Sequence, residues 1–267
     1  MMDHPIIAKE ENQDEACYRQ FYEEAISLCR KKRFHEVLEK CRYTSLDDEE
    51  EYSIDVIQPE KIEFKQNSYE DGENSIISFP EFLLLVLDVC TGGEQPASHY
   101  QPDKLIEKFD ALKTHFTAGE FYEKMLYYRL LLDYYTIRRD IKDGQGNYSL
   151  ILKGPKDDND KLKQYQSMLY VSTEAFYNWL KPYLRKLEQD ELQSCAEMLA
   201  FLKKEDNERH GVLPARKDLS YKASGNIRYW FWRLDYYLWE QRSTFFNEEE
   251  QKIVEHLSLI HISEPTR

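Results

Sequence analysis

Three cysteines and a histidine near the N-terminus are the first residues to test for chemistry. Cys17, Cys29 and Cys41 are spaced by twelve residues, and His35 lies between the last two. Thiolate and imidazole groups bind zinc, but only when the ligands converge on the ion. On one helix a step of twelve residues turns the side chain by about 120°, so the three sulfur atoms point in different directions. We therefore interpret these residues as buried or half-buried thiols.

A turn at Asp143-Gly-Gln-Gly146 contains the glycines that a phosphate-binding loop would need. A P-loop requires Gly-Lys-Ser/Thr at the start of a helix, and a dinucleotide loop requires a third glycine after a strand. Neither pattern is present, so we interpret this segment as a plain turn. Glu255-His256 lies on a charged terminal segment, and His115 and His210 are isolated, so these histidines are interpreted as solvated surface residues.

No catalytic motif stands out elsewhere. The sequence has no His-Glu-x-x-His, no Gly-x-Ser-x-Gly and no acidic pair with a spaced lysine of the nuclease type. We name no catalytic, metal-binding or cofactor-binding residue, and the residues leave open whether the chain is an enzyme.

The densest aromatic cluster, Tyr229–Trp239, could stack nucleic-acid bases. Its rings fall on several faces of one helix, and the surrounding residues are not basic. We favour a buried helix at a domain junction, with Arg228 and Arg233 meeting acidic partners.

The composition indicates a folded chain that is acidic. Its 267 residues allow one large or two modest domains, and 41% apolar with 14% aromatic residues exclude wholesale disorder. The net charge is −14, and the first hundred residues hold about 23 acids and 10 bases. Such a field disfavours independent binding of nucleic acid. An odd number of cysteines, no apolar run of membrane-spanning length and no export signal predict reduced thiols in a cytoplasmic protein.

One segment, 120–139, predicts a helix around which the others pack. Phe121, Met125, Tyr128 and Leu132 recur at three- and four-residue steps, and neighbouring positions are apolar as well. Thr117 and Glu120 form a capping-box pattern at its start. Arg138 and Arg139 are expected in its last turn, where cations suit the helix dipole.

The remaining elements follow from caps, breakers and apolar spacing. Ser78, Pro80 and Glu81 begin a buried helix that Thr91-Gly-Gly93 ends. Further helices are expected over 14–41, 102–112, 158–171, 190–204 and 248–257. Another is expected to begin at a cap on Ser172 or Thr173 and to run to Leu187, with a kink or break at Pro182. A helix over 226–242 is expected to have Ser224 as its cap. Between these helices we expect an acidic break over 46–51 and an extended linker over 52–72, which leaves open a short strand and ends in a turn at Glu70–Asn74. We also expect an extended segment at Asn147–Lys153 and a polar loop over 205–222.

These elements predict a mainly α fold, an irregular multi-helix bundle with at most one small β-hairpin. We expect an acidic N-terminal helix and linker over 1–74, after a loose tail over 1–12, and a helical domain over 75–257. Residues 258–267 resemble the peptide produced when sequencing-adapter DNA is translated, so we treat them as a non-native tail and exclude them.

The order of several segments resembles the GmrSD-type restriction endonucleases, which act in defence by cutting modified foreign DNA. The resemblance is carried by SIISFPEFLLLVLDV, DKLIEKF, YYRLLLDYYTIRRDI, YSLIL, LKQYQSMLYVSTEAFYNWLKPYLRKL and GNIRYWFWRLDYYLWE, which span roughly 75–257. Members of that family carry a ParB-like N-terminal domain with an Asp-Gly-Gln-Gln-Arg motif that handles nucleotide. A helical region and an HNH nuclease domain follow, so the resemblance implies a nucleotide and a divalent metal in those two domains.

The chain departs from that pattern at both ends. It has no Asp-Gly-Gln-Gln-Arg motif, and the HNH domain would be expected after Leu257, so no catalytic residue is carried over. The resemblance therefore implies the helical connector of such an enzyme. Its partners would be the two missing domains, and DNA would be bound only through the full-length protein. Formation of a homo-oligomer is left open, and binding to a membrane is not expected. The alternative is a free-standing helical protein–protein interaction module that binds through its acidic first hundred residues.

Overall fold

The structure, a computed structural model, describes residues 15–43, 72–141, 148–155, 159–172, 174–215 and 226–257. These residues form a mainly α-helical fold with one small antiparallel sheet, which confirms the predicted fold class. Within this described part, no helix has the length and apolar character that crossing a membrane requires.

Helix α5 (Ala118–Tyr135) is the centre of the fold. Its start is fixed by a capping box in which Thr117 Oγ1 accepts from the Glu120 amide at 3.2 Å and Glu120 Oε2 accepts from the Thr117 amide at 2.7 Å. Every residue from Tyr127 to Tyr134 is buried. The prediction of a central helix that packs on several sides is confirmed.

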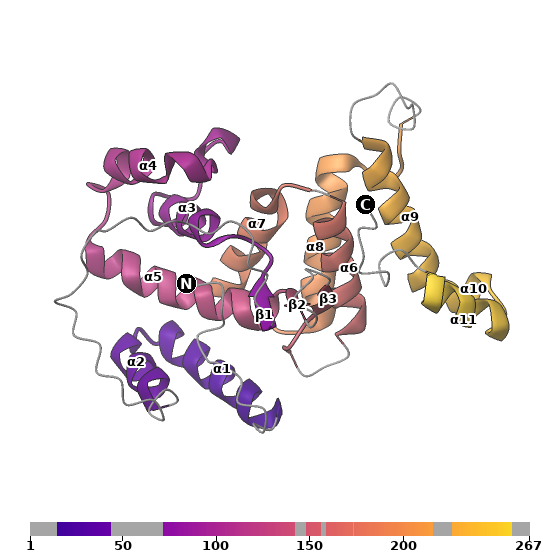
Figure 1. Cartoon of the computed structure of the whole chain (residues 1–267), viewed down its shortest axis with the longest axis horizontal. Coiled ribbons are helices and arrows are strands. Elements are labelled where there is room, and N and C mark those ends of the chain that lie inside the picture. Colours follow the sequence, from indigo (N-terminus) through magenta and orange to yellow (C-terminus); the bar gives the residue numbers. More distant parts are fainter. Residues whose placement is uncertain are drawn as a thin grey trace.

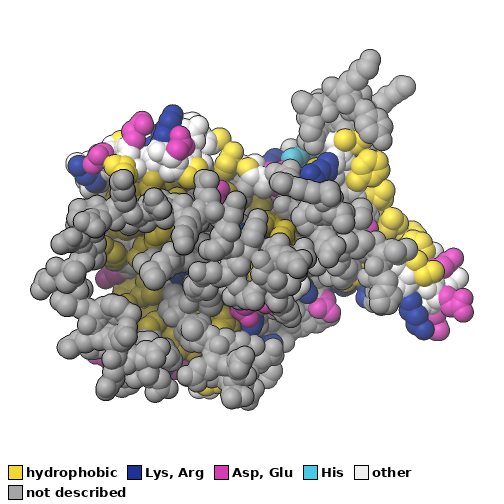
Figure 2. Space-filling view, viewed as in Figure 1, with side chains coloured by type: hydrophobic (Ala, Val, Ile, Leu, Met, Phe, Trp, Pro, Cys, Tyr) yellow, Lys and Arg dark blue, Asp and Glu magenta, His cyan; other side chains and the backbone are white. Residues whose placement is uncertain are grey.

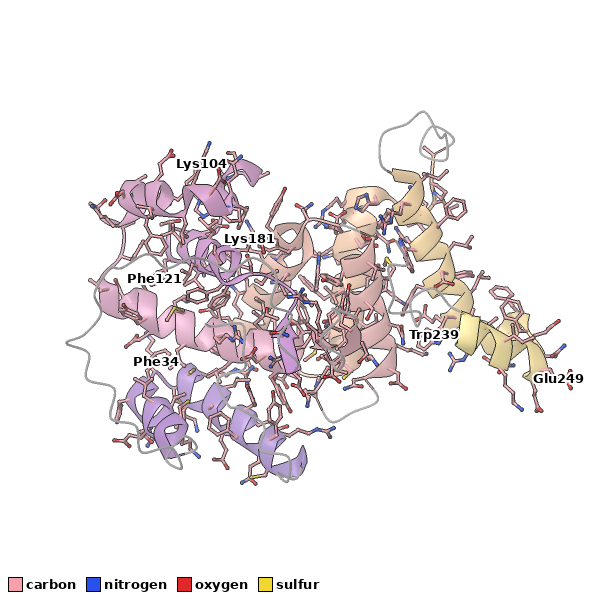
Figure 3. The ribbon with its side chains drawn as sticks, in the orientation of Figure 1. Phe34, Lys104, Phe121, Lys181, Trp239 and Glu249 are labelled. Atoms are coloured by element: carbon pink, nitrogen blue, oxygen red, sulfur yellow. The ribbon has the colours of Figure 1, made fainter. Side chains whose placement is uncertain are left out.

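Three helices pack directly on α5. They are α1 (Glu15–Arg30), α3 (Phe79–Cys90) and α7 (Phe176–Glu188). Figure 1 shows α1 and α3 on opposite sides of α5, and Figure 3 marks Phe121 near the N-terminal end of α5. A second layer follows on each side, because α2 (Phe34–Tyr43) packs on α1, and η3 (Pro102–Lys104) with α4 (Leu105–Leu112) packs on α3.

Another group of helices continues from α7. Helix α7 packs on α8 (Cys195–His210), and α6 (Asp160–Val171) packs on both α8 and α9 (Asn226–Glu240). Helices α10 (Arg242–Phe245) and α11 (Glu248–Leu257) extend beyond the end of α9 at the right of Figure 1. The apolar side chains of both groups form one continuous core.

The sheet lies at the C-terminal end of α5. Its strands β1 (Gly72–Ser75), β2 (Arg138–Ile141) and β3 (Tyr148–Ile151) pair antiparallel in the order β1-β2-β3. Strand β3 confirms the extended segment expected around residue 150. Strand β1 crosses the domain boundary predicted between residues 74 and 75. Residues 72–74 belong to this strand, so the turn predicted at Glu70–Asn74 was wrong for these three residues.

The single helix predicted over 14–41 was wrong, because the chain reverses between α1 and α2. Lys32 adopts a left-handed conformation with φ 57°, and its amide donates to the Cys29 carbonyl at 2.9 Å. The turn lets α2 pack back on α1, which buries Val37. Cys29 is buried and Cys41 half-buried, as expected, whereas Cys17 is exposed. All five cysteines carry thiols rather than disulfide bonds, and burial raises the pKa of Cys29 to about 12.

Arg138 and Arg139 do not end the central helix; they lie in β2. The cause is the buried side chain of Gln166 on α6. Its Nε2 donates to the Tyr135 carbonyl at 3.0 Å, and its Oε1 accepts from the Ile137 amide at 2.9 Å. These two bonds satisfy the backbone where the helix stops and the chain turns into the strand.

Other helix boundaries also differ from the sequence-based prediction. Helix α8 begins at Cys195, five residues after the predicted start, because Ser194 and Glu197 form a capping box there. It runs to His210, six residues past the predicted end, because Asp206 is buried on its inner side. Helix α7 begins after Ala175 with no side-chain cap and continues through Pro182 without a break. Ser172, one of the two residues expected to cap it, donates instead to the Leu169 carbonyl.

The start of α3 agrees with the sequence. Ser78 and Glu81 form the predicted capping box, Pro80 lies in the first turn, and Thr91 follows the last residue of the helix. The predictions for 1–12, 46–51, 52–71, Asp143–Gly146, Thr173, Ser224 and 258–267 lie outside the described residues.

A buried carboxylate, Asp88, ties α3 to its neighbours. It is fully buried, accepts from the Tyr100 hydroxyl and the Gln95 amide, and forms an ion pair of 2.9 Å with Lys181 of α7. Figure 3 shows Lys181 where α7 meets α3. A buried charge is stable only when such partners replace water.

We expect Asp88→Asn to lower the free energy of unfolding by about 3 kcal/mol, because it leaves the largely buried ammonium of Lys181 without its counter-charge. Urea unfolding measures the change. The matched control is Asp110→Asn, which removes an exposed ion pair with Lys113 and should change the free energy by less than about 0.5 kcal/mol. Equal effects for the two variants would contradict the role of Asp88.

Gly154 allows close approach of the chain to α5. A Cβ atom built there would lie 2.5 Å from Cζ of Tyr134, whose side chain is buried. We expect Gly154→Ala to destabilise the protein by about 2 kcal/mol through overpacking. Gly119→Ala, at an open position in the first turn of α5, should be neutral or stabilise by about 0.5 kcal/mol. Thermal unfolding of the two variants tests the contrast, and equal melting temperatures would refute it.

Candidate functional site

A buried charge network lies where α5 meets the sheet. Arg129 Nε donates to Asp133 Oδ2 at 2.8 Å, and Arg138 of β2 lies 3.4 Å from the other carboxylate oxygen. Arg138 Nη2 also donates to the Glu73 carbonyl at 3.0 Å, which joins β1 to the network. Asp133 and Arg138 are each only 1% exposed. The charges of Asp133 and Arg138 therefore hold the sheet on the central helix.

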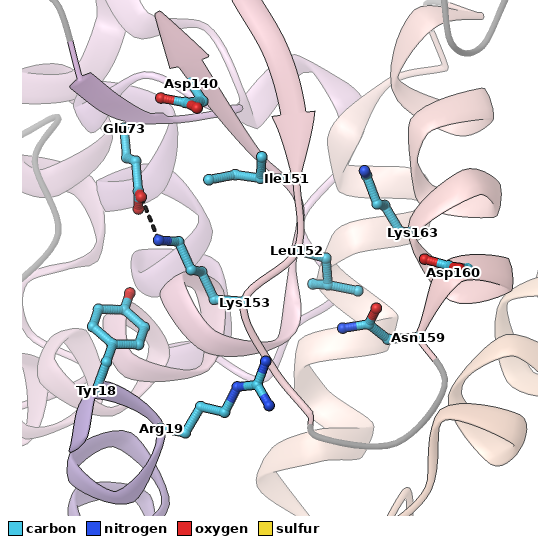
Figure 4. Close-up of a pocket in the computed structure, with 10 residues that line it drawn as sticks. All are labelled: Tyr18, Arg19, Glu73, Asp140, Ile151, Leu152, Lys153, Asn159, Asp160 and Lys163. Carbon is cyan, nitrogen blue, oxygen red and sulfur yellow. Dashed lines mark ion pairs between the residues drawn. The ribbon is translucent and has the colours of Figure 1, made fainter. Parts of the chain in front are cut away.

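A cavity of about 360 Å³ opens beside this network. Figure 4 shows its lining side chains coming from α1, from the three strands and from the start of α6. The lining residues are Tyr18, Arg19, Glu73, Asp140, Ile151, Leu152, Lys153, Asn159, Asp160 and Lys163. Because they come from distant parts of the sequence, only folding brings them together.

The charges in the cavity are balanced. Three cationic and three acidic side chains line it, and the dashed line in Figure 4 marks the ion pair between Lys153 and Glu73. The Lys153 ammonium also lies 5.3 Å from the centre of the Tyr18 ring. Burial raises the pKa of Tyr18 to about 12, so its hydroxyl is protonated at neutral pH.

The lining of the cavity is mostly polar and charged. Among the described lining residues there is no serine, threonine, cysteine or histidine to form a nucleophile–base pair. Across the described ranges, no group of three or more His, Cys, Asp or Glu side chains is placed to hold a metal ion.

A second polar cluster joins α8 to the segment before α7. Nε2 of His210 lies 3.1 Å from Oε2 of Glu174, and Arg209 lies 3.3 Å from Oε1. The His210 ring packs on Tyr229 of α9 with 4.2 Å between ring centres. The interpretation of His210 as an isolated surface residue was therefore wrong. His115 is exposed, as expected, and the side chains of Glu255 and His256 lie outside the described residues.

Asp206 joins three helices next to that cluster. The hydroxyls of Tyr165 and Tyr229 each donate to its Oδ2 at 2.7 Å, and Arg233 lies 3.7 Å away. The expectation that Arg233 meets an acidic partner is confirmed. Arg228 is exposed, and the described residues do not test the same expectation for it.

The aromatic segment of α9 has two different faces. Tyr229, Trp230, Tyr236 and Trp239 are buried against α6 and α8, as the buried-helix interpretation requires. The opposite face carries large apolar side chains that stay exposed. Figure 2 shows them as a yellow strip along α9 toward α10 and α11. The sequence did not separate these faces because apolar residues occur on both.

The buried carboxylates were not among the predicted site residues, although the sequence contains a signal for them. Asp88 and Asp133 each stand inside an otherwise apolar stretch of a helix. A lone acid at such a position has to meet a cation or hydroxyl donors when the helix is buried. Which donors it meets could not be read from the sequence, because they come from other helices.

Comparison of the chain with protein-family models, with curated proteins and with solved structures finds no match.

Glu174 makes stability depend on pH. Burial alone would raise the pKa of this carboxyl group, but hydrogen bonds from His210 and Asn178 and the charge of Arg209 outweigh burial and lower it below its usual 4.5. The stabilisation is therefore complete above about pH 4.5 and is lost as the pH falls through the lowered value.

We expect Glu174→Gln to lower the free energy of unfolding by about 2 kcal/mol at pH 7. Between pH 5 and pH 3 the free energy of unfolding of this variant should fall less than that of the wild type. Urea unfolding at a series of pH values measures both effects. Glu208→Gln is the control, because this exposed residue on α8 forms only a 3.8 Å ion pair with Lys204. Parallel pH profiles for wild type and Glu174→Gln would exclude the assignment.

Proposed function

We propose that this chain is the helical connector of a GmrSD-like restriction endonuclease. In this role it relays nucleotide state or DNA engagement between a nucleotide-handling domain and an HNH nuclease domain of the same enzyme. The observation that carries the proposal is that each resembling segment coincides with an element of one continuous core. They are α3 with β1, α4, α5 with β2, β3, α6 with α7, and α9.

The packing around α5 supports a role in transmission. Helix α5 touches α1 and α3 on opposite sides and α7 as well, and its C-terminal end is tied to β2 by Asp133 and Arg138. A displacement of one of these neighbours would move α5, because closely packed interiors transmit strain.

The chemistry of the described residues supports a non-catalytic role. The described lining of the cavity beside β3 has no serine, threonine or cysteine next to a histidine, and His210 in the second cluster is engaged with Glu174. In the proposal, nucleotide and divalent metal belong to the two other domains, and DNA is bound through the full-length enzyme in the cytoplasm. A free-standing interaction module is the alternative, and the experiment below separates the two.

The purified chain should neither hydrolyse nucleoside triphosphates in the presence of Mg²⁺ nor cleave modified or unmodified DNA. The gene at its source locus should encode an Asp-Gly-Gln-Gln-Arg motif upstream and an HNH domain downstream in the same reading frame. Phosphate release, gel analysis of cleaved DNA and sequencing of the locus measure these outcomes. Hydrolysis or cleavage activity that is present in the wild-type chain and lost in Arg19→Met or Lys153→Met would refute the non-catalytic role. A locus that encodes neither of the two domains would favour the interaction module.

A further inference from the structure

A histidine anchors the surface segment that connects α3 to α4. Residues 94–104 include the short helix η2 (Ala97–His99) and end with η3. Along this segment only His99 and Tyr100 are buried, Gln95 is half-buried, and the other side chains are exposed. A segment held by so few buried side chains opens locally at a small cost in free energy. The state of these two anchors therefore decides whether the segment stays on the fold.

The imidazole of His99 is held in its neutral form. The residue is 1% exposed, and its Nε2 lies 2.9 Å from the carbonyl oxygen of Leu84 on α3. A carbonyl oxygen can only accept a hydrogen bond, so Nε2 carries the proton and Nδ1 does not. Nδ1 is buried and has no hydrogen-bond partner among the described residues. A second proton would bind to this atom, where neither water nor an acceptor would stabilise the charge.

The charged groups that face His99 come from three helices. Asp88 of α3 favours a positive imidazole, whereas Lys108 of α4 and Lys181 of α7 oppose it. Burial has the largest effect. Together with the two lysines it outweighs Asp88 and the Leu84 carbonyl, so the pKa of His99 lies below its usual 6.5. Lys181 also forms a 2.9 Å ion pair with Asp88, so the nearest carboxylate already has a cation beside it.

Tyr100 couples His99 to the junction between α3 and α7. The rings of His99 and Tyr100 meet edge to face, with 5.1 Å between their centres. The Tyr100 hydroxyl donates to Asp88, and the Tyr100 ring stacks on Tyr177 of α7 with 4.6 Å between ring centres. Displacement of His99 would therefore draw Tyr100 away from Asp88 and admit water to the ion pair that joins the two helices.

We propose that His99 makes residues 94–104 a pH-sensitive latch over the junction of α3 and α7. The latch is closed while the imidazole is neutral. It opens when the imidazole takes up a proton, because water reaches both ring nitrogens once the segment has left the fold. The inference rests on this segment alone and not on the proposed function.

The direction of the pH dependence follows from the two states of the latch. In the open segment the imidazole has its usual pKa of about 6.5, and in the closed segment the pKa is lower. Protons therefore bind more tightly to the open state. Closure is complete above about pH 6.5 and weakens as the pH falls below that value toward the lowered pKa.

The first test is hydrogen exchange of the full chain at pH 7.0 and pH 5.5, with each rate divided by the intrinsic rate at that pH. The hydrogen-bonded amides of Gln95, His99 and Tyr100 report on the latch. We expect their protection to fall by about fivefold or more at pH 5.5, while the amides of α5 keep theirs.

His99→Gln retains an N–H donor for the Leu84 carbonyl but takes up no proton, so the fall in protection should disappear. His115→Gln is the matched control, because His115 is exposed on the connection between α4 and α5. This variant should show the same fall as the wild type.

The second test observes the imidazole itself and requires no substitution. Long-range ¹H–¹⁵N spectra of the wild-type chain, with His99 assigned through its backbone, should show the Nε2-protonated tautomer at neutral pH and a titration midpoint below 6.5. The proposal is overturned by an Nδ1-protonated tautomer or by a midpoint at or above 6.5. It is equally overturned by wild-type protection that is the same at both pH values, or by a fall that persists in His99→Gln.

Discussion

The arrangement of the helices depends on three buried aspartates. Asp88 on α3, Asp133 on α5 and Asp206 on α8 are each at most 1% exposed, and each receives cations or hydroxyl groups from elsewhere in the fold. A buried carboxylate without such partners would be strongly unfavourable. Each aspartate therefore favours the one helix arrangement in which its donors are in place, whereas apolar contacts alone tolerate several packings.

These three aspartates connect neighbouring helix groups and the sheet, one after another along the molecule. Asp88 joins α3 to α7 through Lys181, Asp133 joins α5 to the sheet through Arg138, and Asp206 joins α8 to α6 and α9. Each helix group is therefore fixed to the next by at least one buried charge.

The polar cavity and the exposed apolar face of α9 lie in different parts of the molecule. The cavity is formed by α1, the sheet and α6, where Lys153 and Glu73 neutralise each other. The exposed face of α9 lies beyond the last aspartate cluster, and the opposite face is held against α6 and α8 by Tyr229 and Trp239.

The sequence by itself determined the features that depend on neighbouring residues. The capping boxes at Thr117 and Ser78, the central helix and the strand near residue 150 all follow from local spacing, and all are present in the structure. These features are decided by backbone hydrogen bonds and side chains within three or four residues, which a sequence displays directly.

Only the tertiary structure decided the features that depend on distant residues. Gln166 ends α5 at Tyr135 and sends Arg138 into a strand, and Asp206 extends α8 into a segment that reads as a loop. The cavity and the exposed face of α9 belong to the same class. Their residues meet, or remain uncovered, according to which helices pack together, and that is set by contacts between residues far apart in the chain.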